Sequence, residues 1–255
     1  MQKYDSLITV RTSSSRLPGK CLLRFGNEES LLEYIVKRAL SYGLNPIICT
    51  SVDHSDDIIE EISNKCNIPC FRGSLTNKMK RWLDCAEFYK LNYFHTIDAD
   101  DPFFDGHRMK HSLDALTKFK YDYVRPSDYS DSGAGTEGYS IFVPFLKKVC
   151  AIHDSDSLDT EMAVYYFEQF EDARYLTLSN PVYAIDIDKE IPRLTLDFFE
   201  DYIYLNALSF AIDHVSKREE IESLLLKCPS EINFNVKLNI IWKNNQLQKR
   251  IIIDG

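Results

Sequence analysis

Short apolar segments alternate with amphipathic ones through the first hundred residues, and this alternation constrains the fold more than any other feature. The apolar segments, each bounded by polar or turn-forming residues, are 7–10, 46–50, 68–71 and 93–97. Between them, apolar residues recur at helical spacing over 30–40, 55–62 and 78–91. Strands that alternate with helices at this spacing form βαβ units. The sequence therefore predicts an α/β protein with a mainly parallel central sheet flanked by helices.

The second half of the chain has a less regular pattern. It predicts helices at 107–119, 144–152 and 159–170 and from 198 and 216 onward, and extended segments at 121–124, 139–143, 175–178, 183–185 and 193–197. Residues 127–138 are rich in Ser, Asp and Gly, which predicts a long loop. Because no clear linker interrupts the chain, we expect one domain over 1–215 with a helical extension over 216–255 packed on it.

The composition argues against several classes of partner. The chain of 255 residues carries 39 acidic and 30 basic residues, a net charge of −9, which disfavours nucleic acids and anionic membranes as partners. It has no apolar run long enough to span a bilayer, and its first residues lack the apolar core of a signal peptide. Seven scattered cysteines suit a reducing compartment better than a disulfide framework, so we expect a cytoplasmic protein.

A cationic segment, residues 11–20, follows the first predicted strand. It contains three cations and a run of serines: Arg11, Arg16 and Lys20, with Ser13, Ser14 and Ser15. Open α/β sheets bind ligands at loops that follow the carboxyl ends of their strands, and Arg, Lys and backbone N–H groups together bind anions. The alternative is a solvated basic loop. A local excess of cations in an acidic chain favours a polyphosphate site.

A cluster of aspartates follows the fourth predicted strand. Asp98, Asp100 and Asp101 immediately precede Pro102. Clustered carboxylates in this position can hold a hard divalent cation such as Mg²⁺, although a polar turn would also use aspartate. In a parallel sheet this turn opens on the same edge as the cationic segment. Facing charges of this kind would suit a metal–triphosphate complex.

The order of these motifs resembles a known family. The motifs are Arg-Leu-Pro-Gly-Lys at 16–20, Phe-Arg-Gly at 71–73, Arg81, Asp-Asp-Pro at 100–102 and Arg-Leu-Thr-Leu-Asp at 193–197. Together they are similar to the cytidylyltransferases that make CMP-activated acidic sugars, above all to the branch of spore-coat polysaccharide biosynthesis proteins. CMP-Kdo and CMP-sialate synthetases are related. The resemblance, which covers about residues 5–205, implies a single domain with the Rossmann-like nucleotide-diphospho-sugar transferase fold.

The resemblance also implies an activity. CTP would bind over the first loop, and an acidic acceptor would attack its α-phosphorus and release pyrophosphate. Arg16 and Lys20 would be the catalytic residues on the triphosphate, and Asp100 and Asp197 would hold Mg²⁺ as the cofactor. Such charge neutralisation and positioning do most of the work in phosphoryl and nucleotidyl transfer, so no catalytic histidine is required.

Other positions would contact the substrates. By the same resemblance the nucleotide would be bound by the segment from Arg11 through Ser13, Ser14 and Ser15, and by Thr50, Ser51 and Arg81. The acceptor would be bound by Glu137 and Glu161. The chain has Thr160-Glu161-Met162 where this branch usually has Arg-Glu-His, which predicts an unusual acceptor. Family analogy also implies a homodimer formed through residues 127–142.

Two other functions stay open at this point. Asp98-Ala99-Asp100 also matches the Asp-x-Asp pattern with which metal-dependent glycosyltransferases hold a nucleotide-sugar. A non-catalytic relative that kept the fold is the other alternative. His107 and His111 are four residues apart on a predicted helix, but without a third ligand they indicate a surface pair rather than a metal site.

Overall fold

The computed structural model describes residues 3–127, 137–180 and 193–227, and the isolated positions 238, 241 and 244. The extended segment predicted at 183–185, most of the loop predicted at 127–138, and most of the C-terminal extension lie outside the described residues.

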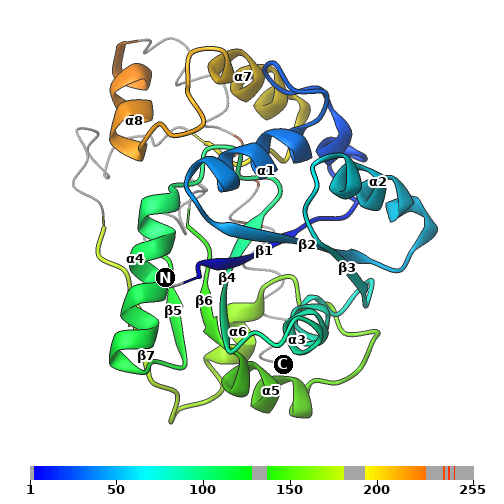
Figure 1. The fold of residues 1–255 in the computed structure, drawn as a ribbon, viewed down its shortest axis with the longest axis vertical. Coiled ribbons are helices and arrows are strands. Elements are labelled where there is room, and N and C mark those ends of the chain that lie inside the picture. Colours follow the sequence, from blue (N-terminus) through cyan, green and yellow to red (C-terminus); the bar gives the residue numbers. More distant parts are fainter. Residues whose placement is uncertain are drawn as a thin grey trace.

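The centre of the molecule is a seven-stranded sheet (Figure 1). Its strands are β1 (Asp5–Thr9), β2 (Asn45–Ser51), β3 (Cys70–Gly73), β4 (Tyr93–Asp98), β5 (Tyr123–Arg125), β6 (Ser140–Phe142) and β7 (Tyr175–Thr177), in the order β3-β2-β1-β4-β6-β5-β7. All pairs are parallel except those that β6 makes with β4 and β5. The predicted mainly parallel α/β fold is confirmed.

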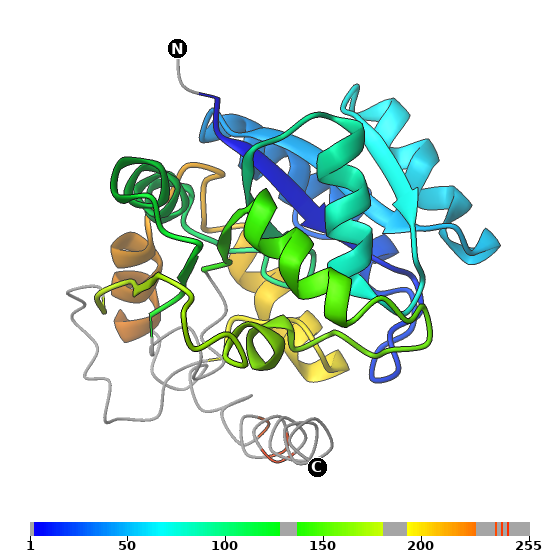
Figure 2. The same ribbon diagram turned by 90° about the horizontal axis from the view of Figure 1, so that it is seen from below.

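Helices cover both faces of the sheet. They are α1 (Leu31–Ser41), α2 (Asp57–Lys65), α3 (Lys78–Phe88), α4 (Gly106–Phe119), α5 (Val143–Ile152), α6 (Ala163–Phe167), α7 (Phe199–Ser209) and α8 (Arg218–Lys227), with short 3₁₀ helices η1 (Lys20–Leu22) and η2 (His54–Asp56). Figure 2 shows α3 and α5 side by side over one face, and Figure 1 shows α1, α2 and α7 grouped above the other.

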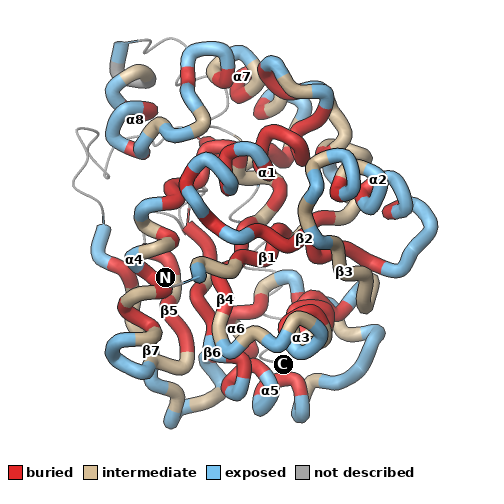
Figure 3. The backbone as a smooth tube through the Cα atoms, viewed as in Figure 1, coloured by how far each residue is buried: buried red, intermediate tan, exposed pale blue. Residues whose placement is uncertain are grey.

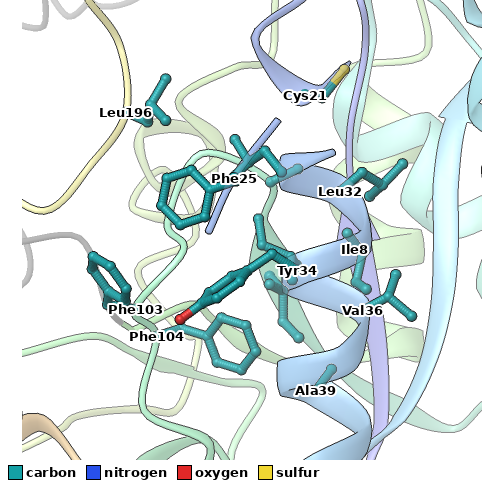
Figure 4. Packing of buried hydrophobic residues seen from close by; sticks show 14 of the residues in the cluster. Ile8, Cys21, Phe25, Leu32, Tyr34, Val36, Ala39, Phe103, Phe104 and Leu196 are labelled. Atoms are coloured by element: carbon teal, nitrogen blue, oxygen red, sulfur yellow. The ribbon is translucent and has the colours of Figure 1, made fainter. Parts of the chain in front are cut away.

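Each strand contributes alternate residues to two hydrophobic cores, because successive side chains of a strand point to opposite faces. In β1, Ile8 packs under α1, whereas Leu7 packs with the residues of α3 and α5. The central strands are accordingly buried along most of their length (Figure 3). Figure 4 shows the α1 side, where Tyr34 meets Phe25 with ring centroids 4.9 Å apart.

Side-chain caps fix where several helices begin. The hydroxyl of Ser30 accepts a hydrogen bond from the backbone N–H of Glu33 and starts α1. Asn77 caps α3 and Asp105 caps α4 in the same way. Such caps satisfy backbone donors that have no partner within the helix. Helices α1, α3 and α4 therefore begin at defined positions.

The C-terminal part that is described packs on the same core. Ile221 of α8 and Leu205 of α7 belong to the hydrophobic cluster that includes Ile8. The buried guanidinium of Arg38 in α1 donates to the carbonyl oxygens of Asp213, His214 and Ser216. These contacts join α8 to the main body. No helix among the described residues is long and apolar enough to cross a membrane.

Two predicted elements are wrong. Residues 193–197 are not a strand: in the described chain they form a connection whose backbone bonds to the β4–α4 turn, through Leu196 N to Asp100 O, 2.7 Å. The helix predicted at 159–170 is confined to α6. In both segments polar side chains bind neighbouring elements, as Thr160 binds Asn77 and Thr195 binds Asp101, and local pattern does not encode such tertiary contacts.

Candidate active site

The site lies where two parallel strands end side by side. Thr9 at the end of β1 is paired in register with Asp98 at the end of β4. The cationic segment and the aspartate cluster therefore start from the same edge of the sheet, as predicted. Between them is a cavity of about 620 Å³. Its lining includes the predicted Arg11, Ser13, Ser14, Ser15, Arg16, Lys20, Arg81, Asp100 and Glu161, together with Thr76, Asp98, Ser157 and Asp159.

The cationic segment has a closed conformation. The carbonyl oxygen of Thr12 accepts hydrogen bonds from the backbone N–H groups of Ser14 and Gly19, each at 2.9 Å. Gly19 has φ of 68°, in the left-handed region that favours glycine. The chain then turns into η1, which begins at Lys20. The Pro-Gly turn predicted from the sequence thus places Lys20 at the floor of the cavity.

Lys20 joins the two predicted metal ligands. Its Nζ lies 2.7 Å from Oδ2 of Asp100 and 3.1 Å from Oδ1 of Asp197, and it also donates to the carbonyl oxygen of Leu196 at 2.8 Å. Burial disfavours the ammonium form, but the two carboxylates outweigh burial and hold the pKa of Lys20 above its ordinary value. The three residues meet as predicted, although the lining of the cavity includes Lys20 and Asp100 and not Asp197.

Asp197 is fully buried and is bound by cations on both oxygens. Arg16 donates to Oδ1 at 2.5 Å, and Arg193 donates to Oδ2. Arg193 also donates to Asp201 at 3.1 Å, so its guanidinium joins two buried carboxylates. Burial alone would raise the pKa of Asp197, but Lys20, Arg193 and Arg16 lower it. The result is a fixed negative charge behind the cationic side chains of the cavity.

A second charged cluster lies at another part of the cavity wall. Glu161 accepts from Arg11 at 3.2 Å and from Lys78 at 3.4 Å, one cation on each carboxylate oxygen. Lys78 also donates to Asp98 at 3.0 Å. Lys78 is buried, yet Asp98 and Glu161 raise its pKa against the effect of burial, and it stays an ammonium ion.

Arg81 is almost completely buried beside Arg11. Both guanidinium groups donate to the carbonyl oxygen of Leu75, and Arg81 donates to the carbonyl oxygen of Ser74 as well. Its Nε atom has no hydrogen-bond partner among the described residues. Burial and the neighbouring charge of Arg11 lower the pKa of Arg81. Two guanidinium groups so close together favour an anion in the cavity.

Three predicted contact residues lie outside the lining of the cavity. The hydroxyls of Thr50 and Ser51 are buried and donate to Asp56, at 3.1 and 2.5 Å. Glu137 is also buried, where it binds Arg108 and accepts from the amide and hydroxyl of Ser127, each at 2.8 Å. These side chains already have partners in the folded chain, so the geometry gives no support to their predicted contacts with nucleotide or acceptor.

Asp100 and Asp197 are carboxylates, the ligand type that Mg²⁺ prefers, but of the two it is Asp100 that lines the cavity. Asp100 binds the ammonium of Lys20, whereas Asp197 binds that ammonium together with Arg16 and Arg193, so both oxygens of Asp197 have cationic partners. Mg²⁺ commonly uses one or two protein carboxylates and completes its shell with water and substrate phosphate oxygens. No group of three or more His, Cys, Asp or Glu side chains in the described part of the chain forms a complete metal site by itself. A metal here would therefore have to bind together with a phosphate-bearing substrate.

Comparison with known proteins decides the family. A model of the cytidylyltransferase family matches residues 6–238. The chain belongs to the cytidylyltransferase family. It is 31% identical over 130 residues to the spore coat polysaccharide biosynthesis protein SpsF of Bacillus subtilis, a match that covers 49% of the chain and 51% of SpsF. The predicted family is confirmed, and the similarity to SpsF agrees with the predicted branch.

Two longer matches extend over nearly the whole cytidylyltransferase. An uncharacterised protein of Methanocaldococcus jannaschii, MJ1063, is 27% identical over 241 residues, which are 92% of this chain and 96% of that protein. The structure of a cytidylyltransferase from Leptospira borgpetersenii is similar with a TM-score of 0.79 and 25% identity, over 91% of this chain and 97% of that one. The Rossmann-like nucleotidyltransferase fold is therefore shared along the length of the chain.

Sequence reasoning gave no role to Lys78 and missed Arg193 as a partner of Asp197. Lys78 is the first residue of α3. A cation is unfavourable at a helix N-terminus, because the helix dipole is positive there. Such a lysine indicates nearby carboxylates, and this signal could have pointed to Asp98 and Glu161. No comparable signal exists for Arg193, whose partners depend on the tertiary fold.

Proposed function

We propose that this cytidylyltransferase transfers CMP from CTP to an acidic small molecule, a sugar acid or another carboxylate or phosphonate, with release of pyrophosphate. The observation that carries the proposal is the meeting of Lys20, Asp100 and Asp197 at the cavity that also contains Arg11, Arg16 and Arg81. A triphosphate brings several negative charges, and a cavity with four cationic side chains can neutralise them. The name of SpsF supports an acceptor used in polysaccharide biosynthesis.

In this proposal Arg16 and Lys20 bind the β- and γ-phosphates and stabilise the pyrophosphate that leaves. Asp197 keeps both cations in place, because it accepts a hydrogen bond from each. Preorganised charge of this kind needs no rearrangement as negative charge develops, which is the largest contribution to many enzymatic rates. Asp100, which lines the cavity, would hold Mg²⁺, and the ion would neutralise charge on the α-phosphate. The geometry gives no support to Asp197 as the second ligand, because both of its oxygens already bind cations.

The acceptor is proposed to be an anion. A carboxylate or phosphonate nucleophile is already deprotonated, so it needs positioning rather than a general base. Arg11 and Lys78 supply positive charge at the wall of the cavity, where Glu161 is their present partner. Neither residue is required to accept a proton, and Lys78 stays an ammonium ion because Asp98 and Glu161 raise its pKa.

The experiment is a pyrophosphate-release assay with CTP, ATP, GTP and UTP against a panel of sugar acids, carboxylates and phosphonates. Each acid is matched with its neutral analogue, for example a sugar acid with the corresponding sugar. The proposal expects release with CTP, and only when an acid is present. Hydrolysis or transfer from a nucleotide-sugar, without release of pyrophosphate from CTP, would favour a glycosyltransferase. No turnover with any nucleotide would favour a non-catalytic relative.

A homodimer is also part of the proposal, on family analogy alone. Of the region 127–142 that we expect at the interface, residues 128–136 lie outside the described chain. Sedimentation velocity at micromolar concentration is expected to show a species of twice the 29.6 kDa chain mass. A species of the chain mass would rule the dimer out.

A further inference from the structure

A buried carboxylate outside the cavity binds the start of the cationic segment. Asp56 has no exposed surface. Its Oδ1 accepts hydrogen bonds from the backbone N–H and the hydroxyl of Thr12, each at 2.8 Å. Its Oδ2 accepts from Thr50 and Ser51 at the end of β2. One carboxylate thus connects the loop after β1 to the end of the neighbouring strand, and the donors from Thr12, Thr50 and Ser51 are all neutral.

From its position in the sequence, Asp56 would be expected to cap a helix. It is the N-cap residue of α2, where an aspartate usually accepts from a backbone N–H in the first turn of its own helix. Its side chain makes no such cap and points instead to Thr12, Thr50 and Ser51. Burial opposes the charged form, but the hydrogen bonds from Ser51 and Thr12 outweigh it, and the pKa of Asp56 is lowered. The carboxylate therefore binds the loop after β1 and not the first turn of α2.

Thr12 connects Asp56 to the segment that carries Arg16 and Lys20. Its carbonyl oxygen closes the loop at both ends, through Ser14 N–H and Gly19 N–H. Arg16 lies between these two bonds, and Lys20 follows directly after them. A shift of Thr12 would therefore move Arg16 and Lys20 relative to Asp197, which both of them bind across the site.

We propose that Asp56 is a positioning residue for the anion-binding loop: through Thr12 it sets where Arg16 and Lys20 stand in the cavity. The proposal deepens the proposed function, on which its meaning for nucleotide binding rests. The attachment of the loop to Asp56 can be measured without any ligand, which keeps the two ideas separately testable.

The test compares Asp56→Ala with the matched control Asp57→Ala by hydrogen exchange of the full-length protein, read peptide by peptide. Asp57 is the next residue, also an aspartate, but its partners are Arg72 and His54, and the carboxylate is exposed. In Asp56→Ala the amides of residues 12–20 are expected to exchange about tenfold faster, while those of β4 keep their protection. Asp57→Ala should leave both regions unchanged.

The outcomes separate positioning from a general structural role. Unchanged exchange over 12–20 in Asp56→Ala would overturn the proposal. So would faster exchange spread equally over β1, β2 and β4, because that would report loss of global stability. If Asp56→Ala does not fold, Thr12→Val decides, because it removes the hydroxyl that contacts Asp56 and Ser55 and keeps the amide bond to Asp56. Local loosening of 12–20 is expected, whereas unchanged exchange would overturn the proposal.

Binding supplies a second readout, with inorganic pyrophosphate as the probe. Calorimetry is expected to show affinity about tenfold weaker in Asp56→Ala, and unchanged in Asp57→Ala, because displaced cations lose their charge-assisted contacts. Equal affinity in the two variants would overturn the role of Asp56 in anion binding. If the wild-type protein does not bind pyrophosphate, the proposed function is wrong, and the exchange result alone still decides whether Asp56 holds the loop.

Discussion

Lys20 and Asp100, which are 80 residues apart in the sequence, form an ion pair with 2.7 Å between Nζ and Oδ2. The pair forms because β1 and β4 are parallel neighbours, so the segments that follow them leave the sheet at the same edge. Asp197, from a third segment, completes the arrangement at 3.1 Å. The charged groups of the site are thus in position before any ligand binds.

Removal of the Lys20 ammonium is expected to abolish most of the activity. Lys20→Ala should lower the rate of pyrophosphate release from CTP by about 100- to 1000-fold, the usual loss when one preorganised donor to a developing charge is removed. The control is Lys37→Ala, which removes an exposed lysine paired with Glu28. Activity of Lys20→Ala within about threefold of wild type would show that Lys20 does not stabilise the transition state.

Arg193 is expected to be essential for stability. Its guanidinium is fully buried between Asp197 and Asp201, so Arg193→Met should remove a buried counter-charge from both carboxylates, although Lys20 and Arg16 still bind Asp197. The free energy of unfolding should fall by about 3–5 kcal/mol, measured by urea denaturation. Lys147→Met, which breaks an exposed ion pair with Glu87, should cause no measurable change. Equal stability of the two variants would contradict the buried network.

Stability is expected to fall at acid pH because of His95. Its ring is buried, Nδ1 is 2.8 Å from the hydroxyl of Ser140, and burial lowers its pKa from 6.5 to about 3. The folded state therefore resists protonation that the unfolded chain accepts below about pH 6.5, so this contribution is present above that pH and is lost progressively as the pH falls toward 3.

The measurement is the free energy of unfolding of wild type and His95→Asn at pH 7 and pH 5. Asparagine can still bond to Ser140 but does not titrate. On lowering the pH, the wild type should lose about 2 kcal/mol more than the variant. The same pH dependence in both proteins would show that His95 does not titrate in this way.

Chelation of divalent metal is expected to stop turnover. Pyrophosphate release should cease in excess EDTA and return when Mg²⁺ is added, and Asp100→Asn should need a higher Mg²⁺ concentration for half-maximal rate, because a neutral amide is a weaker Mg²⁺ ligand than a carboxylate. Asp154→Asn, an exposed aspartate paired with Lys80, is the control and should keep the wild-type requirement. Full activity in EDTA would remove Mg²⁺ from the proposal.

The sequence predicted the parts of the site that follow from strand order. Once β1 and β4 are recognised as parallel strands, Lys20 and Asp100 have to leave the same edge of the sheet. Asp197 was placed by motif resemblance, although its segment is not the predicted strand. Local pattern could not show that Arg193 bridges Asp197 and Asp201.

At Thr50 and Ser51 the sequence predicted nucleotide contacts that the structure does not support. They end a strand at the correct edge, but their hydroxyls bind Asp56 and do not line the cavity. Asp56 has the sequence signature of a helix cap, but its carboxylate binds the backbone N–H of Thr12 instead. The hydrogen-bond partner of a polar side chain depends on which residues lie near it in the folded chain. One sequence does not contain that information directly.

The central claim is that the cavity beside Lys20 binds CTP, and a thermal-shift panel tests it most directly. The melting temperature is measured with CTP, ATP, GTP and UTP, each with Mg²⁺, for wild type and Lys20→Ala. Because ligands that bind the folded state stabilise it, CTP should raise the melting temperature of the wild type most, and Lys20→Ala should lose the shift. No shift with any nucleotide, or an equal shift in Lys20→Ala, would contradict the account.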